Sequence, residues 1–394
     1  VVLNNPNAIE VSGLPDLSPE HLRSGRNQEV ALAASQGQVL GLNDSTVRTL
    51  TALQAFRPKQ AWNQFRRPAT LVRLETVKLA EDIAGIGRYD KSVARKVVFG
   101  ERGSGKSVLL LQAQAMASVN GWVVVHIPEG RDLIHGNTAY EPLSGPDGVT
   151  YVQPESTAQL LGNIALANHT LLSTMALRKQ HRLPIVVRPD TSLAEFAMMG
   201  AEDPPVAWSV WEAFWSELRM PSDGRQELAR PPVMYSMDGM NHVMGMSHYL
   251  DPNVKPIHAH KLALVRHFAS MLGGKLSLPN GGAVVAATSA SGTCVAATME
   301  HCLEAAFARQ QGRVAPVWDP WAAKDESVER SLEGVQVIKS QGLSKAEARG
   351  LMEYYARNGV LRATVTDQLV GEAWTLAGSG IIGALEKGVV RLRF

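Results

Sequence analysis

Apolar runs and turn residues alternate through the middle of the chain in the pattern of an α/β protein. Residues 96–99 form a short apolar strand that runs into a glycine-rich turn, residues 100–105. Apolar positions then recur at helical spacing until Asn120-Gly121, and residues 122–127 form an unbroken apolar run that ends before a proline. A run that is apolar on both faces is typical of a buried parallel strand. The pattern predicts a strand, a helix and a second parallel strand.

The same pattern predicts further elements along the chain. Apolar residues recur three and four positions apart after Ser156, which predicts one long helix over residues 156–180. A second helix over residues 208–218 carries a stripe of tryptophans that we expect to be helix core. A capping box from Ser344 to Glu347 starts a third helix. Three more apolar runs are predicted strands, at residues 233–237, 283–287 and 335–339.

These elements predict an α/β fold with a parallel sheet flanked by helices. They also predict three consecutive regions. Residues 1–55, rich in Asn, Gly, Ser and Pro, are expected to form an N-terminal arm with short helices. Residues 56–310 are expected to form the core with a basic segment at its start, and residues 311–394 a helical, lid-like C-terminal region.

The turn between the first strand and helix carries a motif with a known chemistry. Residues 100–107 read G-E-R-G-S-G-K-S and match the phosphate-binding loop G-x-x-x-x-G-K-[ST]. Its glycines let backbone N–H groups converge on phosphate oxygens, and the following helix adds its positive N-terminal end. We predict that the nucleotide-binding residues are Gly100, Glu101, Arg102, Gly103, Ser104, Gly105, Lys106, Ser107 and Val108.

A nucleotide bound at such a loop is usually accompanied by Mg²⁺. Ser107 is a candidate metal ligand through its hydroxyl group. Asp238 ends the predicted strand 233–237, as a Walker B aspartate does, and is the second candidate metal ligand. A strand-end aspartate that caps its own turn is the structural alternative for Asp238.

The residues after Asp238 argue against fast hydrolysis. A catalytic acid often follows the Walker B aspartate, but position 239 is glycine. Glu129, just after the strand 122–127, is the weak catalytic candidate, with a surface glutamate as the alternative. The guanine-specificity motif N-K-x-D is absent, so the spacing of the motifs leaves both GTP and ATP open.

Composition excludes several classes of protein. Hydrophobic residues make up 45% of the 394 residues, which excludes wholesale disorder. The two cysteines, Cys294 and Cys302, are too few for a disulfide framework or a four-thiolate zinc site. No run of about 18 apolar residues is present, so we expect no membrane span.

The net charge of +2 hides an uneven distribution. Residues 54–106 hold 12 basic and 5 acidic residues, which is +7, and leave −5 for the rest. Interleaved basic and aromatic residues from Phe56 onward could bind RNA, with Trp62 or Phe65 stacking on a base. The alternative is a solvated basic face over buried aromatics. The candidate RNA contacts are Arg57, Lys59, Arg66, Arg67 and Arg73.

Five segments together resemble the death-associated protein 3 family, the GTP-binding proteins of the mitochondrial small ribosomal subunit. They are the loop at residues 100–107, V-V-V-H-I-P at 123–128, M-D-G-M-N at 237–241, G-G-A-V-V-A-A-T-S at 281–289 and the segment 344–361. The first motif is shared by many NTPases, whereas the set of five, in this order, is specific to the family. The resemblance covers roughly residues 56–361.

The resemblance implies an AAA/STAND-like P-loop NTPase core with a helical C-terminal part. It implies guanine nucleotide and Mg²⁺ as ligands and residence in the mitochondrial matrix, in the head of the small ribosomal subunit. The implied partners are ribosomal RNA, neighbouring mitoribosomal proteins and, through bridges, the large subunit. The resemblance therefore favours a structural role in mitochondrial translation with at most slow GTP hydrolysis. A catalytic ATPase or GTPase that acts as a nucleotide-driven switch is the alternative.

Overall fold

A computed structural model describes residues 1–23, 30–86, 91–145, 148–222, 230–289 and 296–391, and Cys294 lies outside these ranges. The strands are β1 (Val39–Gly41), β2 (Ala69–Leu71), β3 (Val93–Gly100), β4 (Val123–Ile127), β5 (Glu141–Gly145), β6 (Gly148–Val152), β7 (Val233–Asp238), β8 (Met246–Leu250), β9 (Pro256–His258), β10 (Gly282–Ala287) and β11 (Gln336–Ser340).

The longer helices are α1 (Asp44–Ala52), α2 (Leu74–Ala84), α3 (Lys106–Val119), α4 (Pro154–Ala167), α6 (Leu193–Glu202), α7 (Pro204–Leu218), α8 (Ala263–Leu272), α9 (Ala297–Gln310), α11 (Lys345–Arg357), α12 (Asp367–Leu376) and α13 (Ile382–Arg391). The shorter ones are α5 (His169–Leu172), α10 (Glu326–Ser331), η1 (Pro19–Leu22), η2 (Ala31–Ser35), η3 (Trp62–Gln64), η4 (Gly130–Leu133), η6 (Met240–Val243) and η7 (Ala259–Lys261). In the part of the chain that the structure describes, none of these helices is both long and apolar enough to cross a bilayer.

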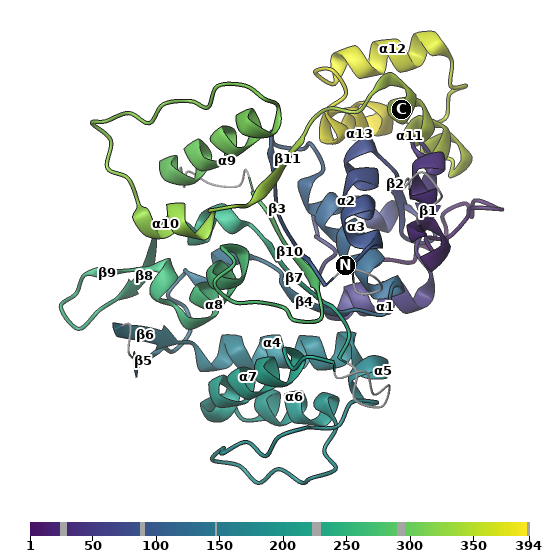
Figure 1. The fold of residues 1–394 in the computed structure, drawn as a ribbon. Coiled ribbons are helices and arrows are strands. Elements are labelled where there is room, and N and C mark those ends of the chain that lie inside the picture. The colour runs from purple at the N-terminus through teal and green to yellow at the C-terminus, as the bar shows by residue number, and fades with distance from the viewer. Residues whose placement is uncertain (24–29, 87–90, 146–147, 223–229, 290–295, 392–394) are drawn as a thin grey trace. The chain divides into compact units, whose positions relative to one another are not determined.

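The central feature of the fold is a five-stranded sheet with the strand order β11-β3-β10-β7-β4. β4, β7 and β10 pair in parallel, with Ile127 opposite Met237 and Ala287 opposite Asp238. The predicted strands all lie in this sheet, and helices accompany it (Figure 1). The expected α/β class with a parallel sheet flanked by helices is therefore confirmed.

The chain divides into two compact units that do not follow the three consecutive regions expected from the sequence. Unit 1 contains residues 1–85, 98–120 and 339–394, and unit 2 contains residues 86–97 and 121–338. β3 and β11 each begin in unit 2 and end in unit 1. The phosphate-loop motif and the C-terminal helices consequently belong to the same unit.

Unit 1 joins the two ends of the chain in one hydrophobic core. Val11, Val39 and Phe65 pack in the same cluster as Leu351 and Tyr355 of α11. β1 pairs with β2 in antiparallel orientation, and α2 lies beside α3 (Figure 1). The described part of residues 1–55 thus packs within unit 1, which differs from the arm that its polar composition predicts, because Val11, Val39 and the partly buried Leu14 pack against the C-terminal helices.

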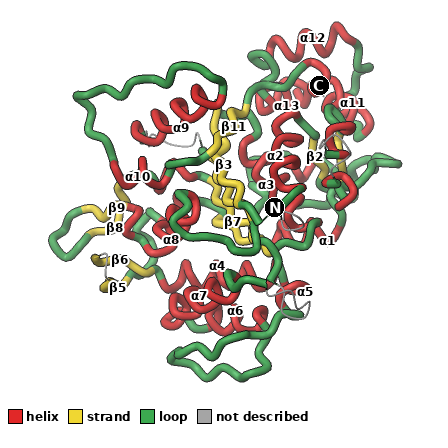
Figure 2. Tube along the Cα trace, viewed as in Figure 1, coloured by secondary structure: helices red, strands yellow, loops and turns green. Residues whose placement is uncertain are grey.

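Unit 2 contains β4, β7 and β10 together with a layer of three packed helices, α4, α6 and α7 (Figure 2). Trp211 and Trp215 of α7 are buried, and the Trp215 ring lies 5.1 Å from the ring of Tyr235 on β7. The neighbouring His267 is also in ring contact with Trp215, and burial lowers its pKa to about 3, so this ring is neutral in the core at pH 7. Trp211 and Trp215 are helix core, as the sequence predicts, whereas Trp208 of the same stripe is half-buried.

The prediction of one long helix over residues 156–180 is wrong after residue 167. α4 ends at Ala167 because the amide side chain of the next residue, Asn168, bonds the backbone of β4. Its Oδ1 accepts from the Val124 N–H (2.7 Å), and its Nδ2 donates to the Val124 carbonyl (2.9 Å). The apolar periodicity continues past Asn168. The backbone after α5, however, forms hydrogen bonds with other segments of the chain and does not continue the helix.

Residues 178–181 bind the buried carboxylate of Glu217 at the end of α7. The backbone N–H groups of Arg178 and Lys179 each donate to it at 3.0 Å, and His181 Nε2 lies 2.9 Å away. Arg230 Nη2 donates to the same carboxylate at 2.6 Å, and both side chains are almost fully buried. Burial opposes ionisation of Glu217, but these hydrogen bonds outweigh it and hold its pKa below the ordinary value of 4.5.

We predict that Glu217→Gln lowers the free energy of unfolding at pH 7 by about 3–5 kcal/mol, because it leaves the Arg230 guanidinium buried without a counter-charge. Since the pKa of Glu217 is lower in the folded state, its contribution is present above pH 4.5 and is lost as the pH falls. Urea unfolding at pH 7 and pH 4 tests both statements. Glu300→Gln, at an exposed position of the same unit, is the control. Equal stability of the Glu217 variant and this control at pH 7 would contradict the prediction.

Candidate functional site

The glycine-rich motif forms a tight turn between β3 and α3 in unit 1. Gly100, Gly103 and Gly105 have φ values of +139°, +79° and +93°, a region that other residues rarely adopt. Gly105 is the N-cap of α3, so the helix begins directly at Lys106. The first N–H groups of a helix have no intrahelical partner and favour an anion. The predicted strand–loop–helix context of the motif is therefore present.

Lys106 is folded back onto this turn. Its Nζ donates to the carbonyls of Gly100 (2.8 Å) and Glu101 (2.6 Å), and the side chain is buried. Ser104 is fully buried, whereas Glu101, Arg102 and Gly103 are exposed, and Ser107 and Val108 are half-buried. The Lys106 ammonium group is thus bound to the backbone of the loop. The N-terminus of α3 adds a partial positive charge at the same place.

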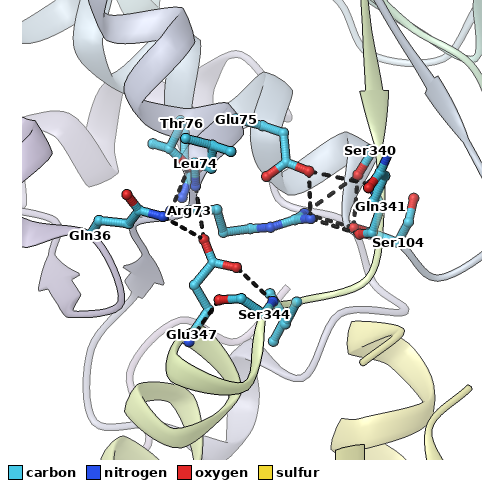
Figure 3. Close-up of polar contacts among 12 residues, drawn as sticks. Gln36, Arg73, Leu74, Glu75, Thr76, Ser104, Ser340, Gln341, Ser344 and Glu347 are labelled. Atoms are coloured by element: carbon cyan, nitrogen blue, oxygen red, sulfur yellow. Dashed lines mark hydrogen bonds and ion pairs between the residues drawn. The ribbon is translucent and has the colours of Figure 1, made fainter. Parts of the chain in front are cut away.

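The guanidinium of Arg73 forms a hydrogen bond with the backbone of the loop (Figure 3). Arg73 precedes α2, and its Nη1 donates to the Ser104 carbonyl at 2.8 Å. Its Nη2 donates to the Glu75 carboxylate (2.9 Å) and to the Gln341 carbonyl (2.7 Å). Ser340, the last residue of β11, donates through Oγ to the same Ser104 carbonyl at 2.9 Å. One peptide group of the loop is therefore fixed from two segments that are far apart in sequence.

The buried carboxylate of Glu347 connects the residue after Arg73 to the start of α11. The Glu347 carboxylate accepts from the Ser344 N–H (2.9 Å) in the predicted capping box of α11. It also accepts from the Leu74 N–H at the start of α2 (2.9 Å) and from Gln36 Nε2 (3.3 Å) (Figure 3). The capping box predicted from the sequence is thus confirmed, and the same carboxylate caps a second helix.

The C-terminal helix α13 also contacts the loop. The Gly383 N–H donates to the Gly103 carbonyl at 2.9 Å. A Cβ on Gly105 would lie 2.9 Å from Ile382 Cδ1, and a Cβ on Gly100 would collide with the Ser340 carbonyl oxygen. Gly100 is therefore required by close approach to the backbone as well as by its φ value, whereas Gly105 is favoured by its φ value.

A cavity of about 640 Å³ adjoins the loop within unit 1. Gly100 and Glu101 line it from the loop, Glu75 and Glu347 from the polar cluster, and Trp374 from α12. Most of its lining residues are polar, with apolar side chains contributed by Leu74, Leu343, Trp374 and Ile381.

In unit 2, the predicted metal and acid candidates lie at neighbouring strand ends. Asp238, buried at the end of β7, accepts from the Gly239 N–H at 2.9 Å. Gly239 has a φ of +69°, and a Cβ there would collide with the Glu129 carboxylate, which follows β4. The Glu129 side chain thus occupies the space that a side chain at position 239 would need. Burial lowers the pKa of the nearby His242, which favours its neutral form.

The five candidate RNA contacts have different surroundings. Lys59 is exposed, and Arg57 and Arg66 are half-buried at the surface. Arg67 is bound internally, with Nη1 2.7 Å from the Asp16 carboxylate and Nη2 donating to a backbone carbonyl. Arg73 is buried against the loop and is not presented to a surface partner. Lys59, Arg57 and Arg66 therefore stay predictions, whereas Arg73 is part of the buried contacts of the loop.

The aromatic residues between these basic positions are core. Phe56, Trp62 and Phe65 are all buried, and the Phe65 ring stacks on Tyr355 with centroids 5.7 Å apart. The Phe56 and Trp62 rings meet edge to face at 5.1 Å. Base stacking by Trp62 or Phe65 is therefore not supported, and the alternative of a basic face over buried aromatics describes this segment.

Sequence reasoning missed the loop contacts of Ser340, Gln341 and Gly383. One signal could have found the first two. They follow the predicted strand 335–339, and the carboxyl ends of parallel strands meet at the edge where α/β proteins bind ligands. No comparable signal marks Gly383, which lies outside the five segments that resemble the family.

Comparison with known proteins agrees with this architecture. Residues 70–388 match the family described as mitochondrial ribosomal death-associated protein 3. The chain is 37% identical over 390 residues to the small ribosomal subunit protein mS29 of Neurospora crassa, covering 98% of this chain and 80% of the relative. It is 20% identical over 344 residues to the small ribosomal subunit protein mS29 of Schizosaccharomyces pombe, covering 85% of this chain and 68% of the relative.

The chain belongs to the mitochondrial ribosomal death-associated protein 3 family. This confirms the family that the five sequence segments predict. The expected localisation, in the mitochondrial ribosome, is confirmed with it.

We predict that Gly239→Ala lowers the free energy of unfolding by at least about 1–2 kcal/mol, because alanine resists a positive φ and its Cβ collides with the Glu129 carboxylate. Thermal and urea unfolding measure the change. The matched control is Gly245→Ala in the same unit, where a Cβ has open space and φ is not positive. Glu129→Ala in the Gly239→Ala background should recover the steric part of the loss. Equal stability of the two glycine variants would contradict the prediction.

Proposed function

We propose that this chain is a structural protein of the mitochondrial small ribosomal subunit that retains a guanine nucleotide with Mg²⁺ at residues 100–107. Membership of the family and the names of both relatives support the ribosomal part. The observation that carries the nucleotide part is the loop itself, a glycine turn with positive φ values that ends in the N-cap of α3 and holds Lys106.

The residues present suit a nucleotide phosphate. Backbone N–H groups at the start of α3 and the Lys106 ammonium would bind its oxygens, and the Ser107 hydroxyl would be a ligand to Mg²⁺. The metal role of Asp238 stays a prediction from its position at the end of a strand and from the family resemblance. A retained ligand of this kind stabilises the folded state by mass action without being consumed.

Slow or absent hydrolysis is part of this proposal. Position 239 has no side chain to act as a base, and its φ of +69° disfavours a glutamate there. Guanine specificity comes from the family resemblance, and ATP stays open. Location in the subunit head, contacts with ribosomal RNA and bridges to the large subunit are likewise proposed from the resemblance.

One observation favours the alternative, a catalytically active GTPase or ATPase. The Glu129 carboxylate lies against Gly239, next to Asp238, within unit 2. An acid at this position could polarise a water molecule in place of the residue that is missing after Asp238.

We predict that Lys106→Ala weakens nucleotide binding by at least about tenfold, because it removes the charged group that would bind the phosphates. Titration calorimetry with GDP, GTP and ATP in the presence of Mg²⁺ measures the loss and the base preference. Lys78→Ala, an exposed position on α2, is the control. Affinity at the wild-type level in the Lys106 variant would mean that the loop does not bind nucleotide. Single-turnover hydrolysis separates the two functions: fast turnover that Glu129→Gln abolishes would establish the catalytic alternative.

We further predict that Lys59→Glu combined with Arg66→Glu weakens association with the small ribosomal subunit, because these accessible cations would otherwise neutralise RNA phosphates. The loss should be largest at low salt, where electrostatic binding is strongest. Sedimentation with subunits over a series of salt concentrations is the measurement. Arg313→Glu combined with Arg330→Glu makes the same charge change at exposed positions of unit 2. Identical salt dependence of the Lys59/Arg66 variant and the wild type would exclude this segment as an RNA contact.

A further inference from the structure

The peptide group between Ser104 and Gly105 is the most constrained part of the loop. Its carbonyl oxygen accepts from Arg73 Nη1 at 2.8 Å and from Ser340 Oγ at 2.9 Å. Arg73 Nη1 lies 3.4 Å from Ser340 Oγ as well, so the two donors and the acceptor form a closed triangle (Figure 3). Both donor side chains are buried, which protects these bonds from competition by water.

Fixing this carbonyl also fixes the direction of an N–H group. A trans peptide is planar, so its C=O and N–H bonds point in opposite directions. With the Ser104 carbonyl turned toward Arg73, the Gly105 N–H is turned away from it, at the residue that caps α3. A charged donor on the carbonyl also polarises the peptide and makes its N–H a stronger donor to an anion.

The guanidinium is itself immobilised. Its second nitrogen is held by the Glu75 carboxylate and the Gln341 carbonyl, and the backbone N–H of Arg73 donates to Thr76 Oγ1 at 3.0 Å. A Cβ on Gly105 would lie 3.3 Å from Arg73 Nη1, which places the guanidinium in contact with the loop backbone. A planar fork with several donors suits this arrangement better than a lysine ammonium would.

We infer that Arg73 and Ser340 are positioning residues of the phosphate loop, which hold the Gly105 N–H in the orientation that binds a phosphate oxygen. This inference rests on the proposed nucleotide binding and names what keeps that site in its binding geometry. Arg73 belongs to the segment before α2, and Ser340 to the start of the C-terminal segment 339–394. The affinity of the loop for phosphate therefore depends on the docking of a segment that lies more than 200 residues away in sequence.

The test compares Ser340→Ala, Arg73→Met and the double variant in the full chain. Binding of GDP with Mg²⁺ is one readout, and binding of inorganic pyrophosphate, which probes the phosphate site without a base, is the second. We expect Ser340→Ala to weaken both about fivefold and Arg73→Met to weaken both about tenfold or more. Because the two donors share one acceptor, the losses in the double variant should not be additive.

Matched controls separate positioning from general destabilisation. Arg230→Met removes an equally buried arginine that is paired with a glutamate in unit 2. Ser331→Ala removes a buried serine hydroxyl in the same unit. These controls should lower the melting temperature and leave both affinities within twofold of the wild type. Hydrogen exchange should accelerate at residues 104–108 in the Ser340 and Arg73 variants and stay unchanged there in the controls.

The outcomes distinguish this inference from the proposed function. If the wild type binds GDP and pyrophosphate and Ser340→Ala and Arg73→Met bind them equally well, the positioning role is overturned while nucleotide binding stands. If Arg73→Met does not fold, Ser340→Ala decides alone, because it removes one hydroxyl and no charge. If the wild type binds neither probe and equals Lys106→Ala, nucleotide binding itself is excluded and the positioning role with it.

Discussion

The burial of one positive charge organises unit 1. A guanidinium removed from water costs free energy unless its donors find acceptors, so the fold must bring those acceptors to it. For Arg73 they are the Glu75 carboxylate and the carbonyls of Ser104 and Gln341, from three separate segments. The loop, the start of α2 and the end of β11 are thereby held in one arrangement. Removing this side chain would take a charged donor away from three segments at once, and Ser340 Oγ would be left as the side-chain donor to the Ser104 carbonyl.

The buried carboxylate of Glu347 has the complementary role for backbone donors. It accepts from the first residues of α2 and α11, whose N–H groups have no partner inside their own helices. Two helix starts are thus closed by one side chain, next to the arginine that holds the loop. In unit 2, Glu217 acts in the same way on the backbone of residues 178 and 179. Each unit therefore contains a buried acid that closes backbone donors far from it in sequence.

Local sequence patterns predicted the fold well wherever the determining contacts are themselves local. The strands of the central sheet, the loop with its glycines and the α11 capping box all follow from neighbouring residues. The prediction for residues 156–180 was wrong because Asn168 bonds to β4, a contact that periodicity does not contain. Arg73 seemed to be a surface cation for the same reason, since two of its three acceptors lie 31 and 268 residues away. The placement of Glu129 against Gly239 likewise depends on the pairing of β4 with β7.

Asn168 also affects the edge of the central sheet. β4 is the last strand in the order β11-β3-β10-β7-β4, so among the described residues one side of its backbone has no neighbouring strand. An exposed strand edge is a template on which another chain can pair and aggregate. The amide of Asn168 bonds both the N–H and the carbonyl of Val124, as a residue of a further strand would do. This side chain thus occupies both outward-facing backbone groups of Val124, so that they are not available for pairing with another chain.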